Sequence, residues 1–320
     1  MMLHPNMPSP DDREGAEVPA ALPAVIDAHV HIFPDAVFAA VRAWFDRHGW
    51  RIRYRLSSVE IIEYLLFRGV GHVVALQYAH KPGIATQLND YMAGICRRFA
   101  GRVTGMATVF PGEAGAEKLL QQAFDAGLGG LKLHAHVQCF DMNGAAMAPL
   151  YDCCRRNGKP VVMHVGREPK SEAYRCDPYV LCSAAKLEMV LRDFPGLKVC
   201  VPHLGLDEIA AYRELLEKHD NLWLDTTMAL AGYFPLEEDI DIGRYRPDRV
   251  MYGSDFPNIP YAWDRELQRL QAATLPPHRL QALLHGNALE FFGLAGISPA
   301  AGTGERATAT GCGPCPNMTP

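Results

Sequence analysis

The feature that most constrains the fold is an apolar segment at residues 24–33, AVIDAHVHIF, with polar side chains at every second position. Its β-branched and aromatic residues predict a buried strand, in which alternate side chains point to the same face. Asp27, His29 and His31 should therefore project together from an otherwise apolar strand. Two imidazoles at the end of a buried strand are typical of a metal site, although a pair of hydrogen-bonded histidines has the same spacing.

Short apolar runs alternate with longer segments of helical pattern along most of the chain. Strands are expected at residues 24–33, 72–77, 103–110, 130–138, 160–166, 198–205, 222–228 and 250–256. This alternation predicts α/β architecture with parallel strands, and eight repeats match a (β/α)8 TIM barrel of about 250 residues. An open doubly wound sheet is the alternative. Its Gly-rich phosphate turn is missing after the first strand, which ends in His-Ile-Phe-Pro.

The expected organisation is a single barrel domain at residues 24–293 between two disordered tails. Residues 1–23 carry five prolines beside an acidic patch and lack the pattern of a signal peptide. Residues 294–320 are rich in Ala, Gly, Thr and Pro. They contain Cys312 and Cys315 in a C-x-x-C motif, which lacks the βαβ context that redox chemistry requires.

Composition excludes several classes of partner. A hydrophobic content of 48% is ordinary for a globular protein, and a net charge of −5 argues against nucleic-acid binding. No apolar run approaches the roughly 18 residues of a membrane helix. Nine scattered cysteines without an export signal favour reduced thiols in the cytoplasm. Helices expected at 57–68 and 287–292 carry aromatic residues that could bury against a second copy in a homodimer.

Polar residues recur at the carboxyl ends of the expected strands, where barrel enzymes keep their active sites. Beyond the first strand they are Lys132, His134, His136, His164, His203, Asp225, Thr227 and Asp255. A barrel closes its strand ends into a ring, so histidines of the first, fifth and sixth strands can converge with the aspartate of the eighth. Such a set suits zinc, manganese or iron, whereas the same groups buried without a metal would carry uncompensated desolvation costs.

These motifs resemble the amidohydrolase superfamily, in particular its amidohydrolase 2 branch. That branch includes aminocarboxymuconate-semialdehyde decarboxylase and γ-resorcylate decarboxylase, along with lactonases and hydratases. The resemblance covers residues 26–292. It rests on D-A-H-V-H, G-L-K-L-H, V-M-H-V-G, V-P-H-L-G, G-S-D-F-P and G-N-A, which start at Asp27, Gly130, Val162, Val201, Gly253 and Gly286.

The resemblance implies one divalent metal ion, with zinc in first place and manganese or iron as alternatives. The implied ligands are His29, His31, His164 and Asp255. It also implies that His203 activates the metal water and that Asp255 shuttles protons. Two-metal members of the superfamily carboxylate a lysine on the fourth strand, so Lys132 leaves a second ion open, although its sequence context favours the single-metal branch.

The expected function is hydrolysis of a small, anionic ester, lactone or amide through a metal-activated water. Non-oxidative decarboxylation of a carboxylated aromatic or muconate-like substrate is the alternative. Arg167 could bind a substrate carboxylate, or pair with Glu168 or another loop residue. Lys132 and His134 are the other expected substrate contacts. A catalytically silent metal- or ligand-binding barrel is the third hypothesis, and it would require a missing ligand or base.

Overall fold

The computed structural model describes residues 11–167, 171–234 and 240–294, and in this part of the chain eight parallel strands form the centre of the molecule. The strands are β1 (Val25–His31), β2 (Val70–Leu76), β3 (Val103–Gly105), β4 (Leu131–His134), β5 (Val161–His164), β6 (Val199–Val201), β7 (Leu222–Asp225) and β8 (Val250–Met251).

The strands close into a ring. The order β1-β2-β3 forms one ladder and β4-β5-β6-β7-β8 forms a second. Parallel bridges join the two ladders at both seams, between Ala107 and Leu131 and between Val30 and Phe256. The predicted TIM barrel is thereby confirmed.

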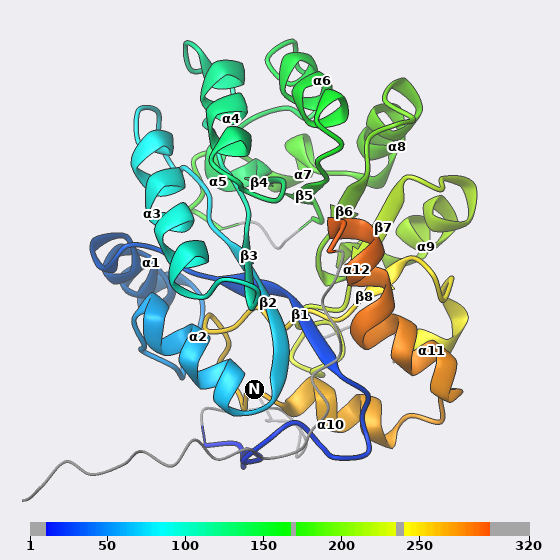
Figure 1. Cartoon of the computed structure of the whole chain (residues 1–320). Helices are drawn as coiled ribbons and strands as arrows, with labels where there is room; N and C mark the ends of the chain where they lie inside the picture. The colour runs from blue at the N-terminus through cyan, green and yellow to red at the C-terminus, as the bar shows by residue number, and fades with distance from the viewer. Residues whose placement is uncertain (1–10, 168–170, 235–239, 295–320) are drawn as a thin grey trace, which may run out of the picture.

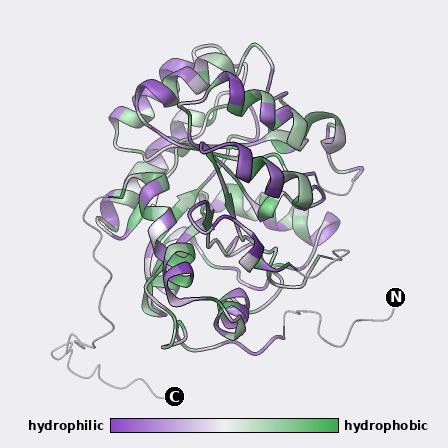
Figure 2. Ribbon diagram, turned by 90° about the vertical axis from the view of Figure 1, so that its right-hand side faces the viewer, coloured by the Kyte–Doolittle hydropathy of each residue, from purple (hydrophilic) through white to green (hydrophobic). Residues whose placement is uncertain are grey.

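Helices surround the strands on the outside (Figure 1). They are α1 (Asp35–His48), α2 (Ser58–Phe67), α3 (Ala85–Arg98), α4 (Ala116–Asp125), α5 (Ala135–Gln138), α6 (Ala148–Arg156), α7 (Pro178–Leu181), α8 (Ala184–Asp193), α9 (Ile209–Lys218), α10 (Arg265–Ala272), α11 (Pro277–Gln281) and α12 (Asn287–Phe292), with short turns η1 (His203–Gly205), η2 (Ile242–Arg244) and η3 (Ala282–Gly286). In Figure 2 the helices mix hydrophobic and hydrophilic residues, while the central strands are mainly hydrophobic. Each helix can therefore pack its hydrophobic side on the strands and leave its hydrophilic side facing outward.

The α12 helix belongs to the core of this chain. Its Phe291 and Phe292 join an apolar cluster with the strand residues Ile26, Val162 and Met251. These aromatic side chains are therefore not available to a second copy, which corrects the expectation for residues 287–292. The other helix expected at an interface, α2, ends in Phe67, whose surface is 82% exposed.

Several strands end earlier than the sequence predicts. β4 stops at His134, and the next four residues form α5, so that His136 lies on a helical turn and not on the strand. β6 stops at Val201, and His203 opens η1 with a positive φ of 58°. At these points the backbone leaves the sheet, so the histidines that follow lie beyond the hydrogen-bonded ladder, on α5 and η1.

The segment before the barrel also departs from expectation. Residues 11–23 were expected to be disordered, but Gly15 N donates to Asp264 Oδ2 at 2.9 Å and Val18 N donates to the Arg68 carbonyl at 2.7 Å. Residues 1–10 and 295–320, with the C-x-x-C motif, lie outside the described residues. Among the described helices, none has the length and apolar character needed to span a membrane.

Candidate metal centre

Three predicted ligand atoms converge at the carboxyl ends of β1 and β8. His29 Nε2 lies 3.2 Å from His31 Nε2, and Asp255 Oδ1 lies 3.5 Å from the first and 3.2 Å from the second. Tetrahedral zinc with ligand distances of about 2.0–2.1 Å places neighbouring ligand atoms about 3.4 Å apart. The three side chains are buried and form a group with the geometry of a metal site. These residues therefore fit a divalent ion.

Hydrogen bonds orient His29 for this role. Its Nδ1 lies 2.8 Å from Asp225 Oδ2, and both side chains are fully buried. Because an ionised carboxylate can only accept, Nδ1 carries the proton and Nε2 presents its lone pair to His31 and Asp255. A carboxylate behind a metal-binding histidine is a common support of such sites. Asp225 was expected at this end of the barrel, but no sequence pattern indicated this contact.

The protonation states also suit a cation. Burial lowers the pKa of His31, and burial together with the nearby Lys132 charge lowers that of His29 well below its usual value. Both imidazoles are then neutral near pH 7, with lone pairs free for a metal. Burial opposes ionisation of Asp255, but its hydrogen bond with His31 brings its pKa down to about 2.

A second buried carboxylate holds the turn that carries Asp255. Asp27 accepts hydrogen bonds from Ser254 Oγ at 2.5 Å and from Ser254 N at 3.1 Å. Asp255 itself has a positive φ of 65°. Burial raises the pKa of Asp27 to about 7, although these hydrogen bonds lower it. Asp27 therefore positions the β8 turn and is not one of the three converging ligands.

Close packing at Gly253 gives a first testable prediction. A Cβ at this position would lie 2.5 Å from Thr227 Oγ1 and 2.7 Å from His29 Cβ. Gly253→Ala should therefore displace His29, lower the stability by about 1–3 kcal/mol and weaken metal binding. The control is Gly286→Ala, where the nearest atom is 3.9 Å away. Thermal denaturation and metal content measure both effects, and equal behaviour of the two variants would contradict the packing argument.

Lys132 lies beside the ligand group, as the sequence predicts. Its Nζ is fully buried and 3.4 Å from His29 Nε2. Burial lowers its pKa to about 8, although the charges of Asp225 and Asp255 oppose that shift. A buried lysine so close to the converging ligands can bind a negative group of a substrate.

His203 stands next to the ligand group without joining it. Its Nδ1 donates to the Thr227 carbonyl at 2.8 Å, which leaves Nε2 as the unprotonated nitrogen of the neutral ring. Its ring centroid is 6.0 Å from that of His29 and 4.8 Å from that of His164. The backbone N of His203 donates to Asp225 at 3.2 Å, so one carboxylate orients both histidines. This arrangement gives His203 the chemistry of a proton acceptor.

His164, expected as a fourth ligand, lies in a separate group with His134 and His136. One ligand atom from each of these three buried histidines falls within 4.8 Å of the others. The His134 ring packs against Tyr78, and its role as a substrate contact stays a prediction. The barrel mouth therefore holds two neighbouring groups of three side chains, and the expected ligands are divided between them.

Arg167 is engaged by loop residues. Its Nε donates to the Cys182 carbonyl at 3.1 Å and lies 3.4 Å from Glu208 Oε2, while the guanidinium stands over the Tyr179 ring. Of the two alternatives from the sequence, these contacts match a loop partner, and a substrate contact remains a prediction. Glu168 lies outside the described residues.

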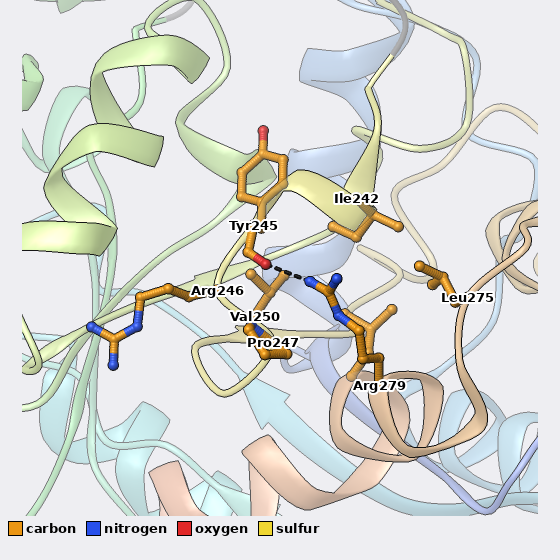
Figure 3. A pocket seen from close by; sticks show the side chains of 8 residues that line it. Ile242, Tyr245, Arg246, Pro247, Val250, Leu275 and Arg279 are labelled. Atoms are coloured by element: carbon orange, nitrogen blue, oxygen red, sulfur yellow. Dashed lines mark hydrogen bonds between the residues drawn. The ribbon is translucent and has the colours of Figure 1, made fainter.

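A small pocket lies at the opposite end of the strands (Figure 3). Its walls include Ile242, Leu275 and Val250, and Val250 is the first residue of β8. Arg279, which also lines the pocket, donates to the Tyr245 carbonyl at 2.6 Å. None of the predicted site residues lines it. The amino ends of barrel strands serve stability and not catalysis, so no reaction is assigned to this pocket.

A family model described as amidohydrolase matches residues 26–294, which is most of the chain. The chain belongs to this amidohydrolase family. Family membership and the converging ligands identify a metal-dependent enzyme that acts on a small molecule. No curated protein matches this amidohydrolase in sequence.

Solved structures share its fold. An uncharacterised TIM-barrel protein from Bordetella bronchiseptica is 19% identical, covering 85% of this chain and 99% of that one, with a TM-score of 0.61. A 5-carboxyvanillate decarboxylase from Novosphingobium aromaticivorans, complexed with manganese and 4-hydroxy-3-methoxy-5-nitrobenzoic acid, is 16% identical over 89% and 99%, with a TM-score of 0.61. A probable 2-pyrone-4,6-dicarboxylic acid hydrolase from Acinetobacter baumannii is 16% identical over 84% and 99%, with a TM-score of 0.55.

Proposed function

We propose that this amidohydrolase hydrolyses a small, anionic ester, lactone or amide with one catalytic divalent metal ion. The observation that carries the proposal is the convergence of His29, His31 and Asp255 beside His203, whose Nδ1 donates to the Thr227 carbonyl. Three protein ligands with a further open position are typical of catalytic and not structural zinc sites. Zinc is our first choice and manganese the second.

The chain's own residues would divide the reaction between them. A bound divalent metal would polarise the substrate carbonyl and lower the pKa of water toward about 7. His203 Nε2 would accept the proton of the attacking water, since Thr227 fixes the proton on Nδ1. As the acyl bond breaks, the Asp255 carboxylate would pass the remaining proton of that water to the leaving oxygen or nitrogen, while His203 keeps the first proton until it is lost to solvent.

Lys132 would bind the anionic group of the substrate. Its ammonium is buried beside the ligand group, where an ion pair is strong because little water screens it. His134, two residues further along β4, would also contact the substrate. Arg167 would contribute only by exchanging its contact with Glu208 for the substrate.

Decarboxylation is the second candidate, and Lys132 favours it as well. The same buried cation could hold the carboxylate that leaves as carbon dioxide. A screen of lactones, esters, amides and carboxylated aromatics with the metal-loaded protein separates the two reactions. Acid release without carbon dioxide supports hydrolysis, whereas carbon dioxide release identifies a decarboxylase. Turnover of neutral or cationic substrates alone would contradict the role of Lys132.

Metal content tests the site without a substrate. Chelator-stripped protein reloaded with zinc or manganese should retain metal, and His31→Gln should lose the ion bound with His29 and Asp255. His219→Gln is the matched control, because His219 lies at the end of α9, outside the ligand group, with its Nε2 3.5 Å from Glu188 Oε1. Elemental analysis after desalting gives the result. Unchanged metal content in His31→Gln would overturn the assignment of the centre.

We also infer a reducing, cytoplasmic environment and a homodimer. All the described cysteines are free thiols, which supports the first inference. The exposed Phe67 at the end of α2 supports the second. Sedimentation of the wild type and of Phe67→Ser tests the dimer, and a monomeric wild type would remove it.

A further inference from the structure

We propose that Cys139 and Cys176 form a thiol–disulfide exchange site, which a small-molecule disulfide such as glutathione disulfide converts into an intramolecular disulfide bond. Both side chains contact the same backbone oxygen. Cys139 Sγ donates to the His136 carbonyl at 3.6 Å, and Cys176 Sγ donates to it at 3.1 Å. One oxygen atom therefore gathers two thiols from segments that are distant in sequence. The pair includes none of the proposed metal ligands, so this inference is independent of the proposed function.

The end of α5 places the first thiol. Cys139 follows the last residue of this helix in the left-handed conformation, with a φ of 54°. The preceding residue, Gln138, is buried and anchors the turn, because its Oε1 accepts from His134 N at 2.8 Å. Cys139 itself is exposed. A small molecule in solution can therefore reach its sulfur.

The segment that carries Cys176 is bound to the same helix end. Arg175 Nη2 donates to the Val137 carbonyl at 3.3 Å, next to the carbonyl that Cys176 contacts. On the other side, Asp177 Oδ1 accepts from Tyr179 N at 2.9 Å and caps α7. Cys176 is therefore held in position by both of its neighbours in the chain, with its thiol against α5.

The surroundings of the two thiols determine the order in which they react. Burial raises the pKa of Cys176 to about 12, and the Cys139 thiol beside it adds to this rise. Cys176 therefore keeps its proton near neutral pH, whereas Cys139 is open to solvent. Because the thiolate is the attacking species and access limits its reaction, Cys139 reacts first.

The exchange takes place in two steps. The Cys139 thiolate attacks one sulfur of the small disulfide, whose S–S bond breaks as a mixed disulfide forms and one small thiolate leaves. Cys176 then loses its proton and attacks Cys139 Sγ, which releases the second small thiolate. The two protons of the protein thiols pass through solvent to the two leaving thiolates. The cysteine pair is oxidised by two electrons, and the small disulfide is reduced to two thiols.

The new bond would connect the 171–177 segment to α5. Tyr174 in this segment packs against His136 with ring centroids 4.8 Å apart, and it stacks on Trp44 of α1 with centroids 5.6 Å apart. A disulfide would hold these aromatic contacts in place. In a reducing cytoplasm the pair stays as two thiols, and the bond forms when small disulfides accumulate, as in redox-sensing proteins.

The test is peptide mapping of the full chain after incubation with glutathione disulfide and alkylation of the remaining thiols. Wild type should give a linked pair of tryptic peptides, residues 133–155 and 176–186, which a reductant separates. The linked protein should unfold about 5 °C higher than the reduced protein, because the bond restricts the unfolded chain. An unchanged unfolding temperature would contradict the inferred fixing of the 171–177 segment.

Serine variants assign the bond within the two peptides. Cys182 is the competing thiol, because its Sγ lies 4.0 Å from His136 Nδ1, but its side chain is fully buried. Cys139→Ser and Cys176→Ser should both lose the link, whereas Cys182→Ser should keep it. Cys176→Ser should also accumulate glutathione on Cys139, because the second step is blocked. Cys96→Ser is the matched control, since it removes a half-buried thiol from α3.

Three results would overturn the site. They are a wild type without modification, a wild type with glutathione on Cys139 and no linked peptides, and a link that persists in Cys176→Ser. Circular dichroism before the incubation confirms that each variant is folded. Metal content is measured on separate samples, so failure of the proposed metal centre leaves this outcome unaffected.

Discussion

Replacing His203 by Asn should reduce turnover by about 10²–10⁴-fold, the usual contribution of a general base, while the metal content stays unchanged. His203 lies outside the group of His29, His31 and Asp255, so its loss should not release their ion. Its Nδ1 proton is held by the Thr227 carbonyl, which directs the basic Nε2 away from that contact. An asparagine amide can form hydrogen bonds at this position but cannot accept a proton.

The measurement is kcat on the substrate identified in the screen, together with elemental analysis of the same samples. His219→Asn is the control, since it removes an imidazole at the end of α9, outside the ligand group. A His203→Asn enzyme with metal and nearly full turnover would exclude His203 as the base. A wild type without turnover on any substrate class would favour the catalytically silent barrel.

The barrel and the first ligand group were predictable because they depend on local periodicity. Alternation in β1 places His29 and His31 on one face, and the barrel rule brings Asp255 of the β8 turn to the same end. The ring seams at Ala107 and Val30 confirm the strand order that this argument needs.

The division of the histidines was not predictable from the same signals. Two-residue spacing assigned His134 and His136 to one strand, but β4 ends at His134 and α5 begins. The direct pairing of His134 with His164 depends on the register of two strands that are distant in sequence. His164 therefore lies beside His134, a placement that no local pattern contains, and its role as a metal ligand stays a prediction.

The supporting carboxylates were also beyond sequence reasoning. Asp225 was identified as a polar residue at a strand end, but its hydrogen bond to His29 joins β7 to β1 and involves residues 196 positions apart. Asp27 was grouped with the ligands by parity, yet it binds Ser254. Such roles depend on which carboxylate is nearest in three dimensions.

Asp255→Asn should weaken binding of the catalytic metal by more than about 100-fold, beyond the range that supporting residues contribute. Asparagine keeps the size of the side chain but removes the negative charge that faces His29 and His31 at 3.5 and 3.2 Å. Competition with a chelating dye measures this loss in the absence of substrate.

Asp225→Asn should have a smaller effect on metal binding. Asp225 Oδ2 contacts His29 Nδ1 at 2.8 Å, which is the ring nitrogen that does not face the ion. Its loss should weaken binding by only about 10–100-fold. The exposed Asp193→Asn should have no effect, since its side chain lies on the surface at the end of α8. Equal losses in Asp225→Asn and Asp255→Asn would show that Asp255 does not bind the ion directly. The order of the three variants therefore identifies which carboxylate is the ligand and which one orients it.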